Sequence, residues 1–121
     1  MKRRLSGFTA EQIALSYERC RLSNNEQMVP KYVGNRKGLG YDIESYNSST
    51  DNSPRFIEVK SLPITGCLFF TERERINLEA LGHAAWLYLV DVNSRKIARI
   101  IQDPCRVLNF TGSAMLYKLK I

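Results

Sequence analysis

A glutamate and a lysine stand two residues apart in the apolar run RFIEVKSL, residues 55–62. Side chains alternate between the two faces of a β-strand, so Glu58 and Lys60 share one face, while Ile57 and Val59 point the other way, into a core. Such a pair can be a solvated surface ion pair worth about 0.5 kcal/mol. It can also be a metal ligand beside a catalytic lysine, and the surrounding residues must decide between these readings.

The preceding strand supplies further carboxylates. YDIESY, residues 41–46, alternates in the same way, with Asp42 and Glu44 on one face. The turn-forming stretch NSSTDNSP, residues 47–54, joins it to RFIEVKSL, so the pattern predicts an antiparallel hairpin over residues 41–62. Glu44 is a candidate extra ligand, although its neighbours lead into the turn.

The hairpin brings Asp42, Glu58 and Lys60 onto one face, roughly 5–8 Å apart at Cβ. The sequence leaves open whether Glu58 or Lys60 lies directly opposite Asp42. Two carboxylates this close repel each other unless a cation lies between them or one is protonated. Mg²⁺ usually takes one or two carboxylates and completes its shell with water and phosphate oxygens. A site for Mg²⁺ or Mn²⁺ at Asp42 and Glu58, with Lys60 stabilising charge on an attacked phosphate, is thus one reading of this face, and the solvated ion pair is the other.

A helix precedes the hairpin. GFTAEQIALSYERCRL predicts a helix over about residues 9–22, in which Thr9 and Gln12 form a capping box. Phe8 and Ile13 have the spacing of a hydrophobic staple at the same helix start.

A short strand and a glycine-containing loop lie between helix and hairpin. MVPKYV, residues 28–33, predicts an edge strand that is interrupted at Pro30 or begins after it. Basic side chains here are candidates for phosphate contacts, although solvated loop charge explains them equally well. Ser61, directly after the lysine of the hairpin, is a candidate to hydrogen-bond near the site. The nucleic-acid-binding candidates are Lys31, Arg36, Lys37 and Ser61.

A second helix and two strands follow. Thr71 and Glu74 form a capping box, and Gly82 is a C-terminal stop, which predicts a helix over residues 71–82. The capping box is the simplest explanation of Glu74. AAWLYLVDV is nearly all apolar and predicts a central strand, and KIARIIQ predicts a further strand.

The order helix, three strands, helix, two strands predicts an α/β domain with a mixed sheet between helices. The tail from residue 103 to 121 is expected to be a loop with one short strand at MLYKLK, residues 115–120. At 121 residues the chain is expected to form a single domain that buries a proper core.

The composition of the chain limits the classes of partner that it is expected to bind. The 18 basic and 12 acidic side chains give a net charge of +6, which favours nucleic acid over an anionic membrane, although solubility alone accounts for such a charge equally well. No apolar run approaches the roughly 18 residues needed to cross a bilayer. Three widely spaced cysteines suit a reducing compartment, so a cytoplasmic location is expected.

The segments GYDIES, RFIEVKS, FFTERER and AAWLYLVDV, in this order, resemble the PD-(D/E)XK nuclease superfamily. More narrowly they resemble the domain at the C-terminus of the NO VEIN protein, whose related modules occur in bacterial and archaeal restriction and helicase-associated proteins. The resemblance covers about residues 7–105 and leaves residues 106–121 as a C-terminal extension. It implies a restriction endonuclease-like core.

The superfamily motif can be carried over residue by residue. The resemblance implies that Asp42 and Glu58 are metal ligands, that Lys60 is the catalytic lysine, and that Glu11 is the helix glutamate many members add. For Glu11 the alternative is a carboxylate at the second position of its helix, favoured there by the helix dipole. The chain departs from the motif at Tyr41, where the superfamily often has proline; the superfamily tolerates this widely.

The resemblance implies a metal-dependent endonuclease acting on DNA, in restriction, defence or DNA processing. A homodimer is expected if both strands are cut, or else membership of a larger helicase or restriction assembly. Two alternatives stay open: a catalytically inactive nucleic-acid-binding module with a nuclease fold, and a protein-interaction domain.

Overall fold

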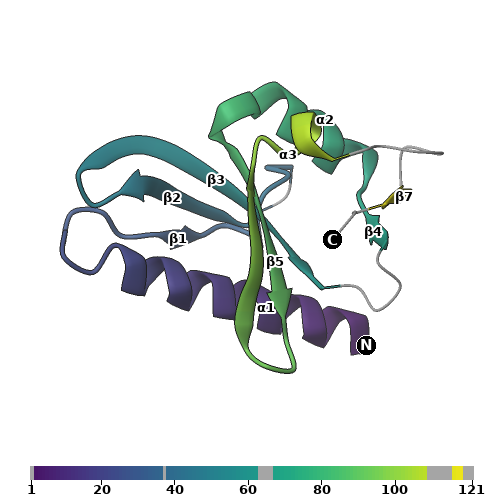
Figure 1. Cartoon of the computed structure of the whole chain (residues 1–121), viewed down its shortest axis with the longest axis horizontal. Helices are drawn as coiled ribbons and strands as arrows, with labels where there is room; N and C mark the ends of the chain where they lie inside the picture. Colours follow the sequence, from purple (N-terminus) through teal and green to yellow (C-terminus); the bar gives the residue numbers. More distant parts are fainter. Residues whose placement is uncertain (1, 37, 63–66, 109–115, 119–121) are drawn as a thin grey trace.

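The computed structural model of the chain describes residues 2–36, 38–62, 67–108 and 116–118, and the side chains of 7–36, 38–62 and 67–108. A five-stranded mixed sheet lies between α1 on one face and α2 with α3 on the other, an α/β fold (Figure 1). In chain order the elements are α1 (Lys2–Arg21), β1 (Lys31–Tyr32), β2 (Ile43–Ser48), β3 (Asp51–Ser61), β4 (Cys67–Phe69), α2 (Glu72–Leu81), the 3₁₀ turn η1 (Gly82–Ala84), β5 (Ala85–Asp91), β6 (Lys96–Gln102), α3 (Pro104–Val107) and β7 (Leu116–Lys118).

The main sheet has the strand order β1-β2-β3-β5-β6. The pairs β1–β2, β2–β3 and β5–β6 are antiparallel, whereas β3–β5 is parallel because α2 lies in the connection between them. This mixed sheet confirms the predicted fold class, with β5 central and β1 an edge strand that begins after Pro30. None of the described helices is long and apolar enough to cross a membrane.

Helix α1 begins at Lys2, so the predicted start at Thr9 is wrong. The capping box of Thr9 with Gln12 and the staple of Phe8 with Ile13 are wrong with it, since these residues lie inside the helix and Phe8 is exposed. The residues before Thr9 include lysine, arginine and leucine, which favour a helix, and no proline; Gly7 weakens the helix but does not break it.

The hairpin predicted over residues 41–62 is present, but its turn is shorter than expected. β2 runs to Ser48 and β3 starts at Asp51, which leaves two residues of the predicted 47–54 turn between them. The turn-forming side chains there are largely exposed, and backbone ladder bonds do not depend on them. Pro54 is tolerated in β3 because β5 pairs with β3 only from Phe56 onward.

Helix α2 follows the predicted pattern closely. Thr71 is its N-cap, the capping box with Glu74 is complete, and Gly82 closes the helix at φ 57°. The described residues also contain two elements that were not predicted, β4 and the short α3. β4 pairs antiparallel with β7 in a second sheet. Part of the predicted tail strand at 115–120 is therefore present as β7; the rest lies outside the described residues.

Two apolar cores lie on opposite faces of the sheet. The core under α1 is made by α1 and by inward residues of β2, β3, β5, among them Ile43, Ile57 and Tyr88. The core on the α2 face includes Phe70 and Leu78. Because strand residues alternate, the face of β3 opposite Ile57 and Val59 turns toward α2, so Glu58 and Lys60 lie on a covered face.

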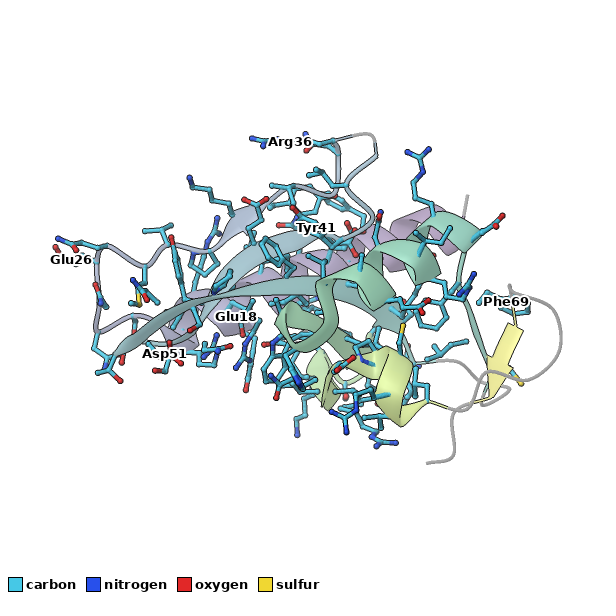
Figure 2. The ribbon with its side chains drawn as sticks, turned by 90° about the horizontal axis from the view of Figure 1, so that it is seen from above. Glu18, Glu26, Arg36, Tyr41, Asp51 and Phe69 are labelled. Atoms are coloured by element: carbon cyan, nitrogen blue, oxygen red, sulfur yellow. The ribbon has the colours of Figure 1, made fainter. Side chains whose placement is uncertain are left out.

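A buried polar network joins α1 to the hairpin and β5. Fully buried Glu18 accepts hydrogen bonds from Ser45 Oγ at 2.6 Å and Tyr88 Oη at 2.7 Å, and from Arg21. Tyr88 Oη in turn accepts from Arg55 Nη1 at 2.8 Å. In Figure 2 Glu18 lies beneath the hairpin strands, toward the end whose tip carries Asp51. This network fixes the hairpin on α1, and the hairpin carries the candidate site at its other end.

The loop before β2 is held on α2 by Asn77, whose Nδ2 donates to the Leu39 carbonyl at 3.1 Å. Gly40 has φ +74°, and a Cβ built there would lie 2.0 Å from Asn77 Nδ2. We therefore expect Gly40→Ala to lower the free energy of unfolding by about 1–3 kcal/mol. Gly7→Ala is the control, since space around Gly7 in α1 is open and alanine there should stabilise by about 0.5–1 kcal/mol.

Urea denaturation of the two variants beside the parent measures both changes. Equal stability of Gly40→Ala and the parent would mean that the loop moves off α2 at no cost, contrary to this prediction.

Candidate active site

Asp42 lies next to Glu58 at the start of the hairpin. The paired register of β2 begins with Ile43 opposite Ile57, and the Asp42 N–H just before it donates to the Ile57 carbonyl at 2.8 Å, while the Asp42 carboxyl is hydrogen-bonded to that of Glu58. Asp42 Oδ2 also accepts the Val59 backbone N–H at 2.9 Å. The question that the sequence left open is thus decided in favour of Glu58 rather than Lys60.

Glu58 is buried, with 3% of its surface exposed. Its neighbours on β5, Leu87 and the adjacent Leu89, belong to the core on the α2 face. Burial raises the pKa of the Glu58 carboxyl well above its usual range, and the charge of Asp42 and a hydrogen bond with it raise this pKa further. The interpretation of Glu58 and Lys60 as a solvated ion pair is wrong. Glu58 is buried on the face of the sheet that carries α2, and Lys60 pairs with Glu74 of that helix.

The Lys60 ammonium pairs with Glu74 of α2. Its Nζ lies 3.0 Å from Glu74 Oε1 and 3.2 Å from Oε2, and 5.1 Å from the centre of the buried Phe70 ring. The positive charge of Lys60 lowers the pKa of Glu58 and of Glu11, although burial outweighs it in both. Lys60 is therefore close enough to lower the pKa values of Glu58 and Glu11 while its ammonium is bound by Glu74.

Glu11 reaches the site from α1. The Tyr32 hydroxyl donates to its Oε1 at 2.8 Å. Burial, then the charge of Asp42, raise the pKa of Glu11 to about 7, with a hydrogen bond to Asp42 adding to the rise. The alternative reading of Glu11 as a helix-dipole carboxylate is wrong, because α1 starts at Lys2 and Glu11 lies in its middle.

The remaining candidates that the structure describes are Glu44, Lys31, Arg36 and Ser61. Glu44 accepts from the Tyr41 hydroxyl at 2.9 Å. Lys31 and Arg36 are exposed before the hairpin, and Arg36 stands away from the body of the domain (Figure 2). Ser61 is half-buried at the end of β3, and Lys37 lies outside the described residues.

The donor set fits a hard divalent cation. Asp42 and Glu58 offer neighbouring carboxyl oxygens, the ligands such a cation prefers, and a metal charge would relieve the repulsion that helps to raise the pKa of Glu58. Among the residues that the structure describes, no group of three or more His, Cys, Asp or Glu is arranged to hold a metal. A site here would consist of two protein carboxylates, with water and phosphate oxygens as the other ligands.

Two surface hollows among the described residues lie away from this cluster. One of about 510 Å³ lies between α1 and the turn that joins β5 to β6, and one of about 360 Å³ lies between α2 and Gly38. Neither is lined by Asp42, Glu58 or Lys60. We identify the candidate site by its chemistry instead, since neighbouring acids with raised pKa values are typical of functional sites.

Two residues of the cluster were missed from the sequence. Glu74 was explained by its capping box alone, and a glutamate that fulfils one role gives no local sign of a second. Tyr32 follows Lys31 in a short edge strand, and nothing in that pattern points to a glutamate on a helix twenty residues earlier. Both contacts join elements that are distant in the chain.

Together these features define an α/β domain whose central hairpin and flanking helices gather four carboxyl groups around one lysine. The family model described as Protein NO VEIN, C-terminal, matches residues 10–101, and the chain belongs to this family. No curated protein and no solved structure matches the chain. The narrower resemblance is thereby confirmed, whereas the place of the chain in the nuclease superfamily stays a prediction.

Proposed function

We propose that this chain is a metal-dependent nuclease domain that hydrolyses phosphodiester bonds in DNA, in restriction, defence or DNA processing. The observation that supports this most is the Glu58 carboxyl, which is buried against Asp42 on the strand that carries Lys60. Burying a second acid beside a first costs stability, and such an arrangement is typical of functional sites.

Asp42 and Glu58 would hold Mg²⁺ or Mn²⁺, which when bound supplies a Lewis acid for the phosphate and makes water more acidic. Asp42 is oriented for this by the Val59 N–H, which donates to Oδ2. Glu58 would hold the cation in its ionised form, and the proton that its raised pKa favours would be released to solvent.

Glu11 would handle the proton of the attacking water, and Lys60 would stabilise the negative charge that develops on the phosphate. Water attacks phosphorus, the bond from phosphorus to the leaving oxygen breaks, and that oxygen takes a proton from solvent. Glu11 is suited to accept the proton of the attacking water, since a base works best when its pKa is near the working pH and that of Glu11 is about 7. The Lys60 ammonium stabilises negative charge as it develops on the phosphate oxygens.

DNA would approach across the loop before β2. Lys31 and Arg36 are exposed there, and Lys37 belongs to the same loop. With Ser61 they form the proposed phosphate-contact set, which the net charge of +6 supports. A second copy of the chain, or a helicase or restriction partner, would supply the second cut in duplex DNA.

The test is incubation of the protein with supercoiled, linear and single-stranded DNA in Mg²⁺ or Mn²⁺. We expect cleavage that EDTA abolishes and that Lys60→Ala loses by on the order of 10²–10³-fold, because a charge on the developing oxyanion is removed. Lys96→Ala is the matched control, since Lys96 is an exposed lysine on β6, and it should cleave like the parent.

Equal cleavage by Lys60→Ala and the parent would refute this assignment of the site. No cleavage by any variant, with DNA still shifted on a gel, would favour the second candidate function, a nucleic-acid-binding module that does not cleave. The observation in favour of that function is the Lys60 ammonium, which is already paired with Glu74. A protein-interaction domain would show neither cleavage nor a salt-sensitive gel shift.

A further inference from the structure

One carboxylate of α2 serves two donors from different parts of the chain. Glu74 Oε1 accepts the backbone N–H of Thr71 at 2.8 Å, which completes the capping box, and also accepts from Lys60 Nζ at 3.0 Å. The second oxygen, Oε2, lies 3.2 Å from the same Nζ. The N-terminus of α2 and the lysine of β3 are therefore held by the same group.

The pair is shielded enough to hold the ammonium in one place. The side chains of Lys60 and Glu74 are 22% and 21% exposed, and the buried Phe70 ring lies under Nζ at a distance typical of a cation–π contact. An ammonium has three N–H donors, so it retains a donor beyond the two oxygens of Glu74. That donor is available to a phosphate or water oxygen.

We propose that Glu74 is the positioning residue of the site: it holds the Lys60 ammonium beside the Asp42–Glu58 pair, with the remaining donor directed at the reacting oxygen. This inference rests on the proposed nuclease function. A lysine side chain has four rotatable bonds, and fixing it before substrate arrives removes an ordering cost from the reaction. Glu74 itself touches neither the substrate nor the metal in this proposal.

The competing explanation is that Glu74 only caps α2, and one substitution separates the two roles. Glutamine serves in a capping box as well as glutamate does. Glu74→Gln therefore keeps the cap and the helix but removes the charge that binds the ammonium. Glu72→Gln is the matched control, because Glu72 is an exposed glutamate in the same helical turn.

The experiment has two readouts on the full chain. The first is the ¹H–¹⁵N NMR signal of the lysine ammonium groups in protein without metal or DNA, with Lys60 assigned by its loss in Lys60→Arg. The second is kcat and KM for DNA cleavage in Mg²⁺. We expect a slowly exchanging Lys60 signal in the parent and in Glu72→Gln but none in Glu74→Gln, with a kcat for Glu74→Gln lower by about 10–100-fold and a KM within about twofold.

The outcomes separate this inference from the function on which it rests. If the parent cleaves DNA in a Lys60-dependent way and Glu74→Gln has the same kcat, the positioning role is wrong and the nuclease stands. A Lys60 signal that persists in Glu74→Gln overturns the role in the same way, whatever the kinetics. If the parent does not cleave DNA, the proposed function is wrong, and the positioning role that rests on it is wrong as well.

Discussion

Glu58→Gln is expected to lose metal-dependent DNA cleavage by on the order of 10³-fold and yet to be more stable than the parent at about pH 8, by about 1–3 kcal/mol. The first effect follows because an amide is a poor ligand for a hard cation and the facing Asp42 alone would hold it weakly. The second follows from the burial of the Glu58 carboxyl, which favours its neutral form.

The direction of the pH dependence follows from the raised pKa. In the unfolded chain Glu58 releases its proton near its ordinary value of 4.5, whereas the folded protein retains the proton to higher pH because burial and Asp42 raise the pKa. The parent therefore loses stability as the pH rises from about 4.5 to the folded-state pKa, and Glu58→Gln does not. Below about pH 4 the two proteins should be equally stable.

Urea denaturation without metal, at about pH 4 and about pH 8, measures the stability of both proteins, and the cleavage assay measures activity. Glu44→Gln is the control, since Glu44 lies on β2 opposite Phe56, two residues from the proposed ligand, and it should match the parent in both assays. Glu58→Gln less stable than the parent at about pH 8 would mean that Glu58 is ionised and satisfied without metal, contrary to the proposed site.

Glu18→Ala is expected to lower the free energy of unfolding by about 3–5 kcal/mol at neutral pH, a large share of the stability of a small domain. Removing the carboxylate leaves the buried hydroxyls of Ser45 and Tyr88 without their acceptor and the Arg21 guanidinium without its counter-ion. Tyr88 also connects to Arg55, whose guanidinium lies 3.5 Å from the centre of the Trp86 ring. The loss therefore reaches α1, β2, β3 and β5 at once.

The pH dependence here has the opposite sign to that of Glu58. Burial alone would raise the pKa of Glu18, but hydrogen bonds from Arg21, Ser45 and Tyr88 outweigh it and the net shift is downward. The contribution of Glu18 is present above its ordinary value of 4.5 and is lost as the pH falls through the lower folded-state pKa. The difference between parent and variant should shrink in acid.

Should Glu18→Ala fail to fold, Glu18→Gln keeps one acceptor oxygen and should lose about 1–3 kcal/mol. Glu26→Ala, at an exposed glutamate in the loop after α1, is the control and should lie within about 0.5 kcal/mol of the parent. Urea curves for the three variants measure these differences, and a Glu18→Ala as stable as Glu26→Ala would contradict the structural importance of the network.

The sequence alone was sufficient for two local features of the site, although the equally local capping box predicted at Thr9 was wrong. Alternation predicted that Asp42, Glu58 and Lys60 share one face of a hairpin, and Thr71 with Glu74 predicted the start of α2. Hydrogen bonds within four residues and the period of a strand are set by neighbours in the chain, so they can be read without knowing the fold.

Only the tertiary structure decided which groups these residues meet. Whether the face that carries Glu58 is exposed to solvent depends on the elements that pack on it, among them α2. The burial of that face is the main cause of the raised pKa of Glu58. Three sets of contacts join elements that are far apart in the chain: Lys60 with Glu74, Glu11 with Tyr32, and the network around Glu18. Local patterns carry no information about such contacts, because packing of the apolar faces brings these elements together.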